Sequence, residues 1–467
     1  MTAPASSAGE LAIVLHSHMP YVEGFGTWPF GEEWLWEAIA TSYLPLLELL
    51  DCGPPTPPVT LSLTPVLCDQ LEAPGAIDRC DAFLAGVRVE SHRRDIQTAR
   101  AAGDGGLVAA LEHSAALYAR ARRRLAALGG DVLGALGRHA TWTSSATHAI
   151  LPLLATDAGV RLQLRTGIDA HRRRFGDGWR GGLWLPECAY APWLDALLEE
   201  AGVHAVCVDL TDVLERDDHL RPLRSQDGPL LVPIDRATIE LVWSDGGYPA
   251  DAAYRDYHHV TEHRHRAWSN DGEPYDLQRA SEAARRHAAD FVARTRERVA
   301  GGGLAVCALD TELLGDWWHE GPLWLAAVIA ECARQGLALV RLDDALARHE
   351  PAEAPARMGV TTWGTPRDLA TWSAPPVARM AWDARDAELR TVAAGAGADA
   401  RAVRELLALQ SSDWAFLVQR DLAEPYGRER AVGHRAALDA ALAEPGTLEP
   451  RLRNLAPDAL PAALLEP

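Results

Sequence analysis

The sequence contains no lysine. All 45 of its basic residues are arginines, and 65 aspartates and glutamates outnumber them, which gives a formal net charge of −20 over 467 residues. A surface with this excess of negative charge repels phosphate backbones and anionic lipid headgroups. We therefore expect neither a nucleic acid nor a membrane surface as a main partner.

Paired cysteines and long apolar runs are missing as well. The seven cysteines are scattered and none forms a C-x-x-C pair, which favours reduced thiols over a disulfide framework or a structural zinc site. The N-terminal stretch has no basic segment, and its apolar run covers only residues 11–15. Such a run is too short for a signal peptide or a membrane span, so we expect a cytoplasmic protein.

Tryptophan, by contrast, is abundant, with 16 residues against 9 tyrosines and 6 phenylalanines. An indole ring combines a broad apolar face with a hydrogen-bonding edge, a combination that suits stacking on sugar rings. Most of these tryptophans are nevertheless expected in the core.

Short apolar runs alternate with long helical stretches. The runs cover residues 11–15, 59–63, 181–186, 204–208, 230–234, 304–309 and 337–342. This alternation predicts βα units and a largely parallel sheet, as in a (β/α) barrel. Most runs end on a polar or ionisable residue, and the active site of such a barrel lies at the carboxyl ends of its strands.

Two further regions read as helices. Residues 78–128 form an Arg- and Ala-rich insertion between early strands, and the chain is helical again from about residue 380. Residues 366–376 are expected to form a loop or hinge before this helical tail. We therefore divide the chain into a catalytic barrel at 1–365 and a C-terminal helical domain at 366–467.

Two carboxylates at strand ends are candidates for catalysis. Glu187 lies in GGLWLPECAY and Asp310 in CALDTELLGDWWHEGP, both beside aromatic residues. A glycosidase needs one carboxylate to attack the anomeric carbon and another to protonate the leaving oxygen. The carboxylates at two other strand ends, Asp209 and Asp343, are expected to cap the helices that follow.

A pair of histidines ends the first predicted strand. His16 and His18 are two residues apart, so both side chains point to one face of the sheet. The H-x-H spacing fits a metal site of a hydrolase, hydrogen bonding to a substrate, or a purely structural role. The spacing alone does not choose among these three.

Blocks along almost the whole chain resemble glycoside hydrolase family 57, and within it the branching enzymes that act on 1,4-α-glucans. The matching blocks are HSHMP (16–20), EEWLWEAI (32–39), TSSATHAILPLL (143–154), GLWLPECAY (182–190), VWSDGGYPAD (242–251), ALDTELLGDWWHEGP (308–322), TTWG…TW (361–372) and RELLALQSSDWAF (404–416). The resemblance implies an incomplete seven-stranded (β/α) barrel with an inserted helical region and a C-terminal α-helical domain.

The resemblance also implies roles for single residues. Glu187 corresponds to the retaining nucleophile and Asp310 to the acid/base. The positions that match substrate-binding residues are His16, His18, Trp34, His148, Trp243, Trp363, Trp372, Asp413 and Trp414. Neither a metal nor a cofactor is implied, the implied substrate is an α-1,4-glucan such as amylose, glycogen or a maltooligosaccharide, and we expect a monomer.

The implied reaction cleaves an α-1,4 bond and transfers the chain to a 6-hydroxyl, which forms an α-1,6 branch. One departure favours an α-amylase-like hydrolase with the same carboxylates. Branching enzymes of the family carry a tyrosine lid loop after the nucleophile block, whereas here no tyrosine occurs between Tyr190 and Tyr248, and the segment after Tyr257 is short. The residues are also compatible with an α-glucan-binding protein of little turnover and with a metal-dependent deacetylase that uses His16 and His18.

Overall fold

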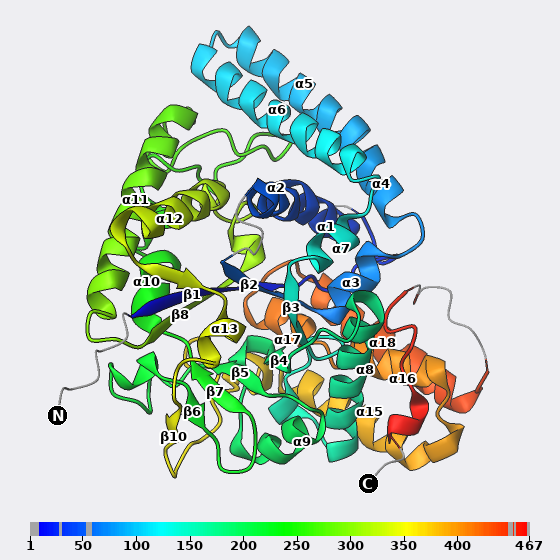
Figure 1. The fold of residues 1–467 in the computed structure, drawn as a ribbon. Coiled ribbons are helices and arrows are strands. Elements are labelled where there is room, and N and C mark those ends of the chain that lie inside the picture. Colours follow the sequence, from blue (N-terminus) through cyan, green and yellow to red (C-terminus); the bar gives the residue numbers. More distant parts are fainter. Residues whose placement is uncertain (1–8, 28–29, 53–57, 447–451, 453, 465–467) are drawn as a thin grey trace, which may run out of the picture.

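We describe a computed structural model, which covers residues 9–27, 30–52, 58–446, 452 and 454–464. The first eight residues, part of the stretch in which no signal peptide is expected, lie outside these ranges. The elements follow one another as strands and helices in alternation, and the C-terminal helices lie beside the sheet (Figure 1). No helix in the covered ranges combines the length and the apolarity needed to cross a membrane.

Seven parallel strands curl into an incomplete barrel, which confirms the predicted fold class. In spatial order they are β7 (Leu230–Pro233), β5 (Ala205–Val208), β4 (Gly182–Trp184), β3 (Ala140–Ser144), β2 (Val59–Leu63), β1 (Glu10–Ser17) and β8 (Leu304–Asp310). Their apolar side chains are almost fully buried. Within the described residues β7 and β8 are not paired as strands, but the Asp235 N–H donates to the Val306 carbonyl at 2.8 Å where they approach.

The strand prediction was wrong at two places. The run 337–342 forms only the short strand β9 (Ala338–Val340), which pairs with the start of β1 at Glu10–Ala12 and is not one of the seven barrel strands. The seventh barrel strand is β3, whose sequence ATWTS contains too few apolar residues to be recognised as an apolar run. Its polar side chains Thr143 and Ser144 are buried at the carboxyl end of the strand, where a barrel tolerates polar groups. Two short strands, β6 (Leu223–Arg224) and β10 (Ala352–Glu353), extend the sheet beyond β7.

Helices cover the outside of the barrel (Figure 1). They are α1 (Glu32–Ala38), α2 (Leu44–Cys52), α3 (Pro65–Leu71), α7 (Val132–Gly137), α8 (Asp157–Phe175), α9 (Asp195–Glu200), α10 (Arg236–Trp243), α11 (Leu277–Arg298), α12 (Gly321–Gln335) and α13 (Leu342–Leu346). The predicted insertion is confirmed as α4 (Ala76–Ala82), α5 (Arg88–Ala101) and α6 (Gly105–Ala127). In Figure 1, α5 and α6 form an antiparallel pair at the edge of the molecule.

The C-terminal helices pack against one flank of the barrel. They are α14 (Ala370–Ser373), α15 (Ala378–Ala394), α16 (Ala400–Leu409), α17 (Ser412–Gln419) and α18 (Tyr426–Ala443), so the expected loop at 366–376 contains a short helix. In α16 the apolar residues Val403, Leu406 and Leu407 recur at helical spacing, and all three are buried. They share a core with Leu162 of α8, which attaches these helices to the barrel.

Neither aspartate that was expected to cap a helix does so. Asp209 is fully buried, and it accepts hydrogen bonds from the N–H and hydroxyl of Thr211 in a turn and pairs with Arg236. Asp343 lies inside α13 and accepts the indole N–H of Trp142 at 3.0 Å. No helix starts directly after β5, and α13 starts one residue before Asp343, which leaves neither residue at an N-cap.

Candidate active site

Glu187 sits in a tight turn at the end of β4. The chain leaves β4 through a 3₁₀ turn at Pro186–Cys188, in which Glu187 adopts a left-handed φ of 59°. A non-glycine residue in this conformation needs support from its surroundings. The segment 361–363 supplies it, because Tyr190 and Thr361 exchange two backbone hydrogen bonds and the Trp363 N–H donates to the Glu187 carbonyl at 3.0 Å.

The Glu187 carboxylate also accepts a side-chain hydrogen bond. The indole N–H of Trp363 donates to Glu187 Oε2 at 2.9 Å. Burial raises the pKa of Glu187, and the Trp363 hydrogen bond and the charge of His18 oppose this rise. The Trp363 hydrogen bond and His18 therefore favour the carboxylate form that a nucleophile requires, against the larger effect of burial.

Asp310 ends β8, the strand beside β1. In the β1–β8 register Asp310 stands opposite His16. Burial, followed by the negative charges of Glu187 and Glu312, raises the pKa of Asp310 well above its usual range. A buried carboxyl group near two others therefore holds its proton, as a general acid must.

The three predicted histidines form one stacked group. His16 Nε2 lies 3.1 Å from His148 Nε2, and the His18 and His148 rings stack with their centroids 3.9 Å apart. His16 also stacks on Trp184 at 4.6 Å. The C-terminal helices reach this group through Ser412, whose hydroxyl lies 2.9 Å from His148 Nδ1, and through Asp413, whose Oδ1 lies 2.9 Å from His18 Nε2.

Only one of these histidines is favoured in the protonated form. Burial disfavours a charge on His18, but Asp413, Glu312 and Glu187 outweigh it and raise the pKa of His18. Burial, reinforced by the neighbouring His18, lowers the pKa of His16 and of His148 well below the usual value. The group therefore favours protonation at His18 and neutral imidazoles at His16 and His148, and these rings can donate hydrogen bonds to hydroxyl groups and accept hydrogen bonds from them.

These side chains open into one large cavity of about 1560 Å³. The predicted site residues that line it are His16, His18, Trp34, His148, Glu187, Trp243, Asp310, Trp363 and Asp413. Trp243 is 45% exposed, and its ring centroid lies 5.7 Å from that of Trp317, which is 43% exposed. A cavity of this size with aromatic walls and a few convergent carboxylates suits an oligosaccharide chain.

Trp372 and Trp414 do not line this cavity, and their expected place as substrate-contacting residues needs correction. Trp372 is 3% exposed, and it packs with Ile150 and Ala189. Trp414 is 1% exposed and donates its indole N–H to the Ala408 carbonyl at 2.7 Å. An indole enclosed on both faces cannot stack on a sugar, so both residues stabilise the packing instead.

Several cavity residues were not among the predicted ones. Glu312 accepts the Tyr43 hydroxyl at 2.5 Å and the His18 N–H at 3.1 Å, and burial raises its pKa to about 7. Its position two residues after Asp310 is the signal that could have identified it. Arg236 carries no such signal, because only the folded chain brings it to the cavity.

One group in the cavity has the donor set of a metal site. The ligand atoms of His18, His148 and Asp413 lie within 4.8 Å of one another. In the structure these side chains are hydrogen-bonded, His18 Nε2 to Asp413 and His148 Nε2 to His16. The geometry therefore fits a hydrogen-bonded group, and it places the first H-x-H histidine outside the potential ligand set.

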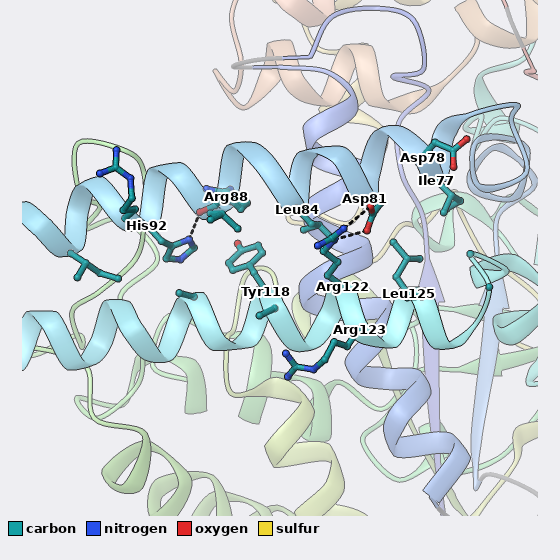
Figure 2. Close-up of a pocket in the computed structure, with 18 of the residues that line it drawn as sticks. Ile77, Asp78, Asp81, Leu84, Arg88, His92, Tyr118, Arg122, Arg123 and Leu125 are labelled. Atoms are coloured by element: carbon teal, nitrogen blue, oxygen red, sulfur yellow. Dashed lines mark hydrogen bonds and ion pairs between the residues drawn. The ribbon is translucent and has the colours of Figure 1, made fainter.

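A second cavity, of about 1030 Å³, lies between α5 and α6 (Figure 2). Among its labelled polar groups, Arg122 pairs with Asp81 and the His92 ring is hydrogen-bonded to the Arg88 carbonyl. Neither Glu187 nor Asp310 lines it. The chemistry of the molecule therefore belongs to the barrel cavity.

Comparisons with known proteins agree with this geometry. Residues 136–357 match the model of glycosyl hydrolase family 57, and residues 379–452 match that of the C-terminal region of 1,4-alpha-glucan branching enzymes. A probable 1,4-alpha-glucan branching enzyme of Mycobacterium tuberculosis is 31% identical over 93% of this chain and 92% of its own length. A 1,4-alpha-glucan branching enzyme of Thermococcus kodakarensis is 29% identical over 91% and 72% of the two chains.

A solved structure is similar over nearly the full length. The crystal structure of a family 57 branching enzyme from Pyrococcus horikoshii superposes with a TM-score of 0.89 at 28% identity, covering 98% of this chain and 97% of that one. The α-amylase AmyC from Thermotoga maritima shares the fold, with a TM-score of 0.82 at 22% identity. On these grounds the chain belongs to glycosyl hydrolase family 57.

Proposed function

We propose that this chain is a 1,4-α-glucan branching enzyme that works by a retaining mechanism. The observation that carries the proposal is the pairing of Glu187 and Asp310 on the wall of a large aromatic-lined cavity. Burial raises the pKa of Glu187, and burial together with the charge of Glu187 raises the pKa of Asp310 well above its usual range. Unequal acidity of two neighbouring carboxyl groups assigns the proton to one and the charge to the other.

In the first step Glu187 acts as nucleophile and Asp310 as acid. A carboxylate oxygen of Glu187 forms a bond to the anomeric carbon of a 1,4-linked glucose, while the bond from that carbon to the leaving oxygen breaks. The Asp310 proton moves to the leaving oxygen. The retained chain is then esterified to Glu187, and Asp310 is left as a carboxylate.

In the second step the acceptor replaces the leaving chain. Asp310 takes the proton of an acceptor 6-hydroxyl, whose oxygen bonds to the anomeric carbon as the Glu187 ester breaks. The histidine group, with the cation on His18, is placed to hold the hydroxyls of the sugar at this point. Trp34, Trp243, Trp363 and Asp413 are proposed to bind the rest of the glucan.

We further propose that residues 1–365 act as the catalytic unit and that 366–467 complete its site. Support comes from Ser412 and Asp413, which reach the histidines from the C-terminal helices. The similarity of residues 379–452 to the C-terminal region of branching enzymes favours transfer over hydrolysis. The missing tyrosine between Tyr190 and Tyr248 favours the hydrolase.

The test is to incubate the purified protein with amylose and to measure new reducing ends and new α-1,6 linkages side by side. Branching predicts α-1,6 linkages with few new reducing ends, whereas an amylase gives reducing ends alone. Wild-type protein that forms neither product, yet binds amylose as tightly as Glu187→Gln does, would point to a glucan-binding protein. Activity on amylose that is insensitive to a chelator would dispose of the metal-dependent deacetylase.

A further inference from the structure

The indole of Trp363 depends on a neighbour that the proposed mechanism leaves unused. Trp363 lies in a segment between β10 and α14 that forms neither helix nor strand. Its backbone is held by the Trp363 N–H on the Glu187 carbonyl and by the neighbouring Tyr190–Thr361 pair. The hydrogen bond from the Trp363 indole N–H to the Glu187 carboxylate also requires a defined position of the ring, since hydrogen bonds weaken steeply with distance and angle. Contacts from outside the segment contribute to this position of the Trp363 ring.

Arg236 is the side chain that reaches this segment from the next wall of the barrel. It is the first residue of α10, after the Asp235 N-cap that follows β7, and it lines the cavity. Its Nη2 donates to the Trp363 carbonyl at 2.7 Å and also to the buried Asp209 carboxylate. A charged donor bound to two acceptors in a buried setting forms stronger bonds than a neutral one.

Two more contacts fasten the same segment to the residues after β5. The Thr361 hydroxyl donates to the Asp209 carbonyl at 2.5 Å, and the Arg367 guanidinium binds the two oxygens of Asp212 at 2.6 and 2.8 Å. The segment 361–367 is thus tied to residues 209–212 on both sides of Trp363. Among these contacts, the hydrogen bond from Arg236 is the one that Trp363 itself accepts.

We infer that Arg236 is a positioning residue, which holds the Trp363 carbonyl and the Asp209 carboxylate together and thereby fixes the Trp363 indole N–H on the Glu187 carboxylate. This inference rests on the proposed role of Glu187 as nucleophile. Arg236 acts through Trp363 and needs no contact with the glucan. Because the indole N–H favours the ionised form of Glu187, a loosened Trp363 makes this carboxylate harder to form.

The test compares Arg236→Gln, Trp363→Phe and the double variant on an α-maltosyl fluoride. Fluoride leaves without help from the acid, so the acid limb of the kcat/KM profile reports the ionisation of Glu187. We expect Arg236→Gln to lower kcat/KM about 10- to 100-fold, mainly in kcat, and to move the acid limb to higher pH. Trp363→Phe should move it in the same direction, and the double variant no further than Trp363→Phe alone.

Arg298→Gln is the matched control. Like Arg236, Arg298 pairs with a buried aspartate, in this case Asp235 at 3.2 Å. Asp235 directly precedes Arg236 in the sequence, but Arg298 does not line the cavity. This variant should lose stability and leave the acid limb in place. Glu187 also faces charges that neither substitution removes, namely Asp310, His18, Asp413 and Arg420.

Three results would overturn the inference: a raised KM with an unmoved acid limb, which indicates direct glucan contact; full additivity in the double variant; or an equal shift in Arg298→Gln. If Arg236→Gln does not fold, Arg236→Lys decides, with an intermediate shift expected and an unshifted limb counting against us. Wild-type protein that is inactive on the fluoride contradicts the proposed function instead. The indole ¹⁵N–¹H resonance of Trp363 then still reports whether Arg236 holds that ring.

Discussion

His18 and Asp413 are joined by a 2.9 Å contact between His18 Nε2 and Asp413 Oδ1, across 395 positions of the sequence. His18 follows the first barrel strand, and Asp413 lies in the first turn of α17. The contact therefore joins the barrel to the C-terminal helices inside the cavity. The charge on His18 depends on it, since Asp413 is the leading group that opposes the effect of burial.

We expect Asp413→Asn to lower the pKa of His18, because the substitution removes the opposing charge that raises it. Chemical-shift titration of the His18 imidazole, assigned with His18→Gln, measures this directly. A group whose pKa is raised by folding stabilises the folded state below its unfolded pKa, about 6.5 for histidine, and loses this contribution as pH rises through the folded value. The stability gap between wild type and Asp413→Asn should therefore shrink as pH rises through the folded pKa of His18, which lies above 6.5 in the wild type. A gap that is constant with pH would contradict an ionic contact.

Replacing each of the two proposed catalytic carboxylates should give a distinct signature. Glu187→Gln removes the nucleophile, and we expect it to abolish turnover of both amylose and an activated α-glucosyl fluoride. Asp310→Asn removes only the proposed acid, so the rate on amylose should fall about 10²–10⁴-fold and the rate on the fluoride much less. Steady-state rates on the two substrates check this, with Glu331→Gln on the surface of α12 as the unaffected control. Equal losses of Asp310→Asn on both substrates would show that Asp310 is not the acid.

The pH dependence of kcat/KM on amylose should be bell-shaped. Activity rises with pH as Glu187 ionises and falls as Asp310 loses its proton, and burial raises the pKa of both groups. Both limbs should thus lie above the usual carboxylate range, with the Asp310 limb at the higher pH. In Asp310→Asn the alkaline limb should disappear. An alkaline limb that persists there would assign it to another group.

Trp243 and Trp414 should separate binding from stability. Trp243→Ala removes a half-exposed ring from the cavity wall, so we expect KM to rise about 5- to 10-fold with little change in melting temperature. Trp414→Ala empties a buried site and should lower the free energy of unfolding by about 3–5 kcal/mol. Kinetics on maltooligosaccharides and denaturant titrations measure the two effects. The opposite pattern would reverse our correction of Trp414.

The alternation of apolar runs with helical stretches was sufficient to predict the βα architecture, because burial in a parallel sheet demands continuous apolar strands. Strand β3 escaped this prediction because its ATWTS residues are mostly polar, and their burial depends on the cavity that they face. The position of Glu187 and Asp310 directly after apolar runs likewise predicted that both lie at the active site. In any barrel the carboxyl ends of parallel strands meet at one rim, whatever the details of packing.

By itself the sequence determined the family, the strand ends that carry Glu187 and Asp310, and the histidines of the first strand, since local spacing and strand direction are properties of the chain. Only the tertiary structure decided which tryptophans face the cavity, that Trp363 bonds Glu187, that Arg236 reaches the site and that Asp413 pairs with His18. Exposure of a side chain and the pKa of a carboxyl group depend on neighbours from distant segments. No pattern along one segment can specify those neighbours, because packing alone brings them together.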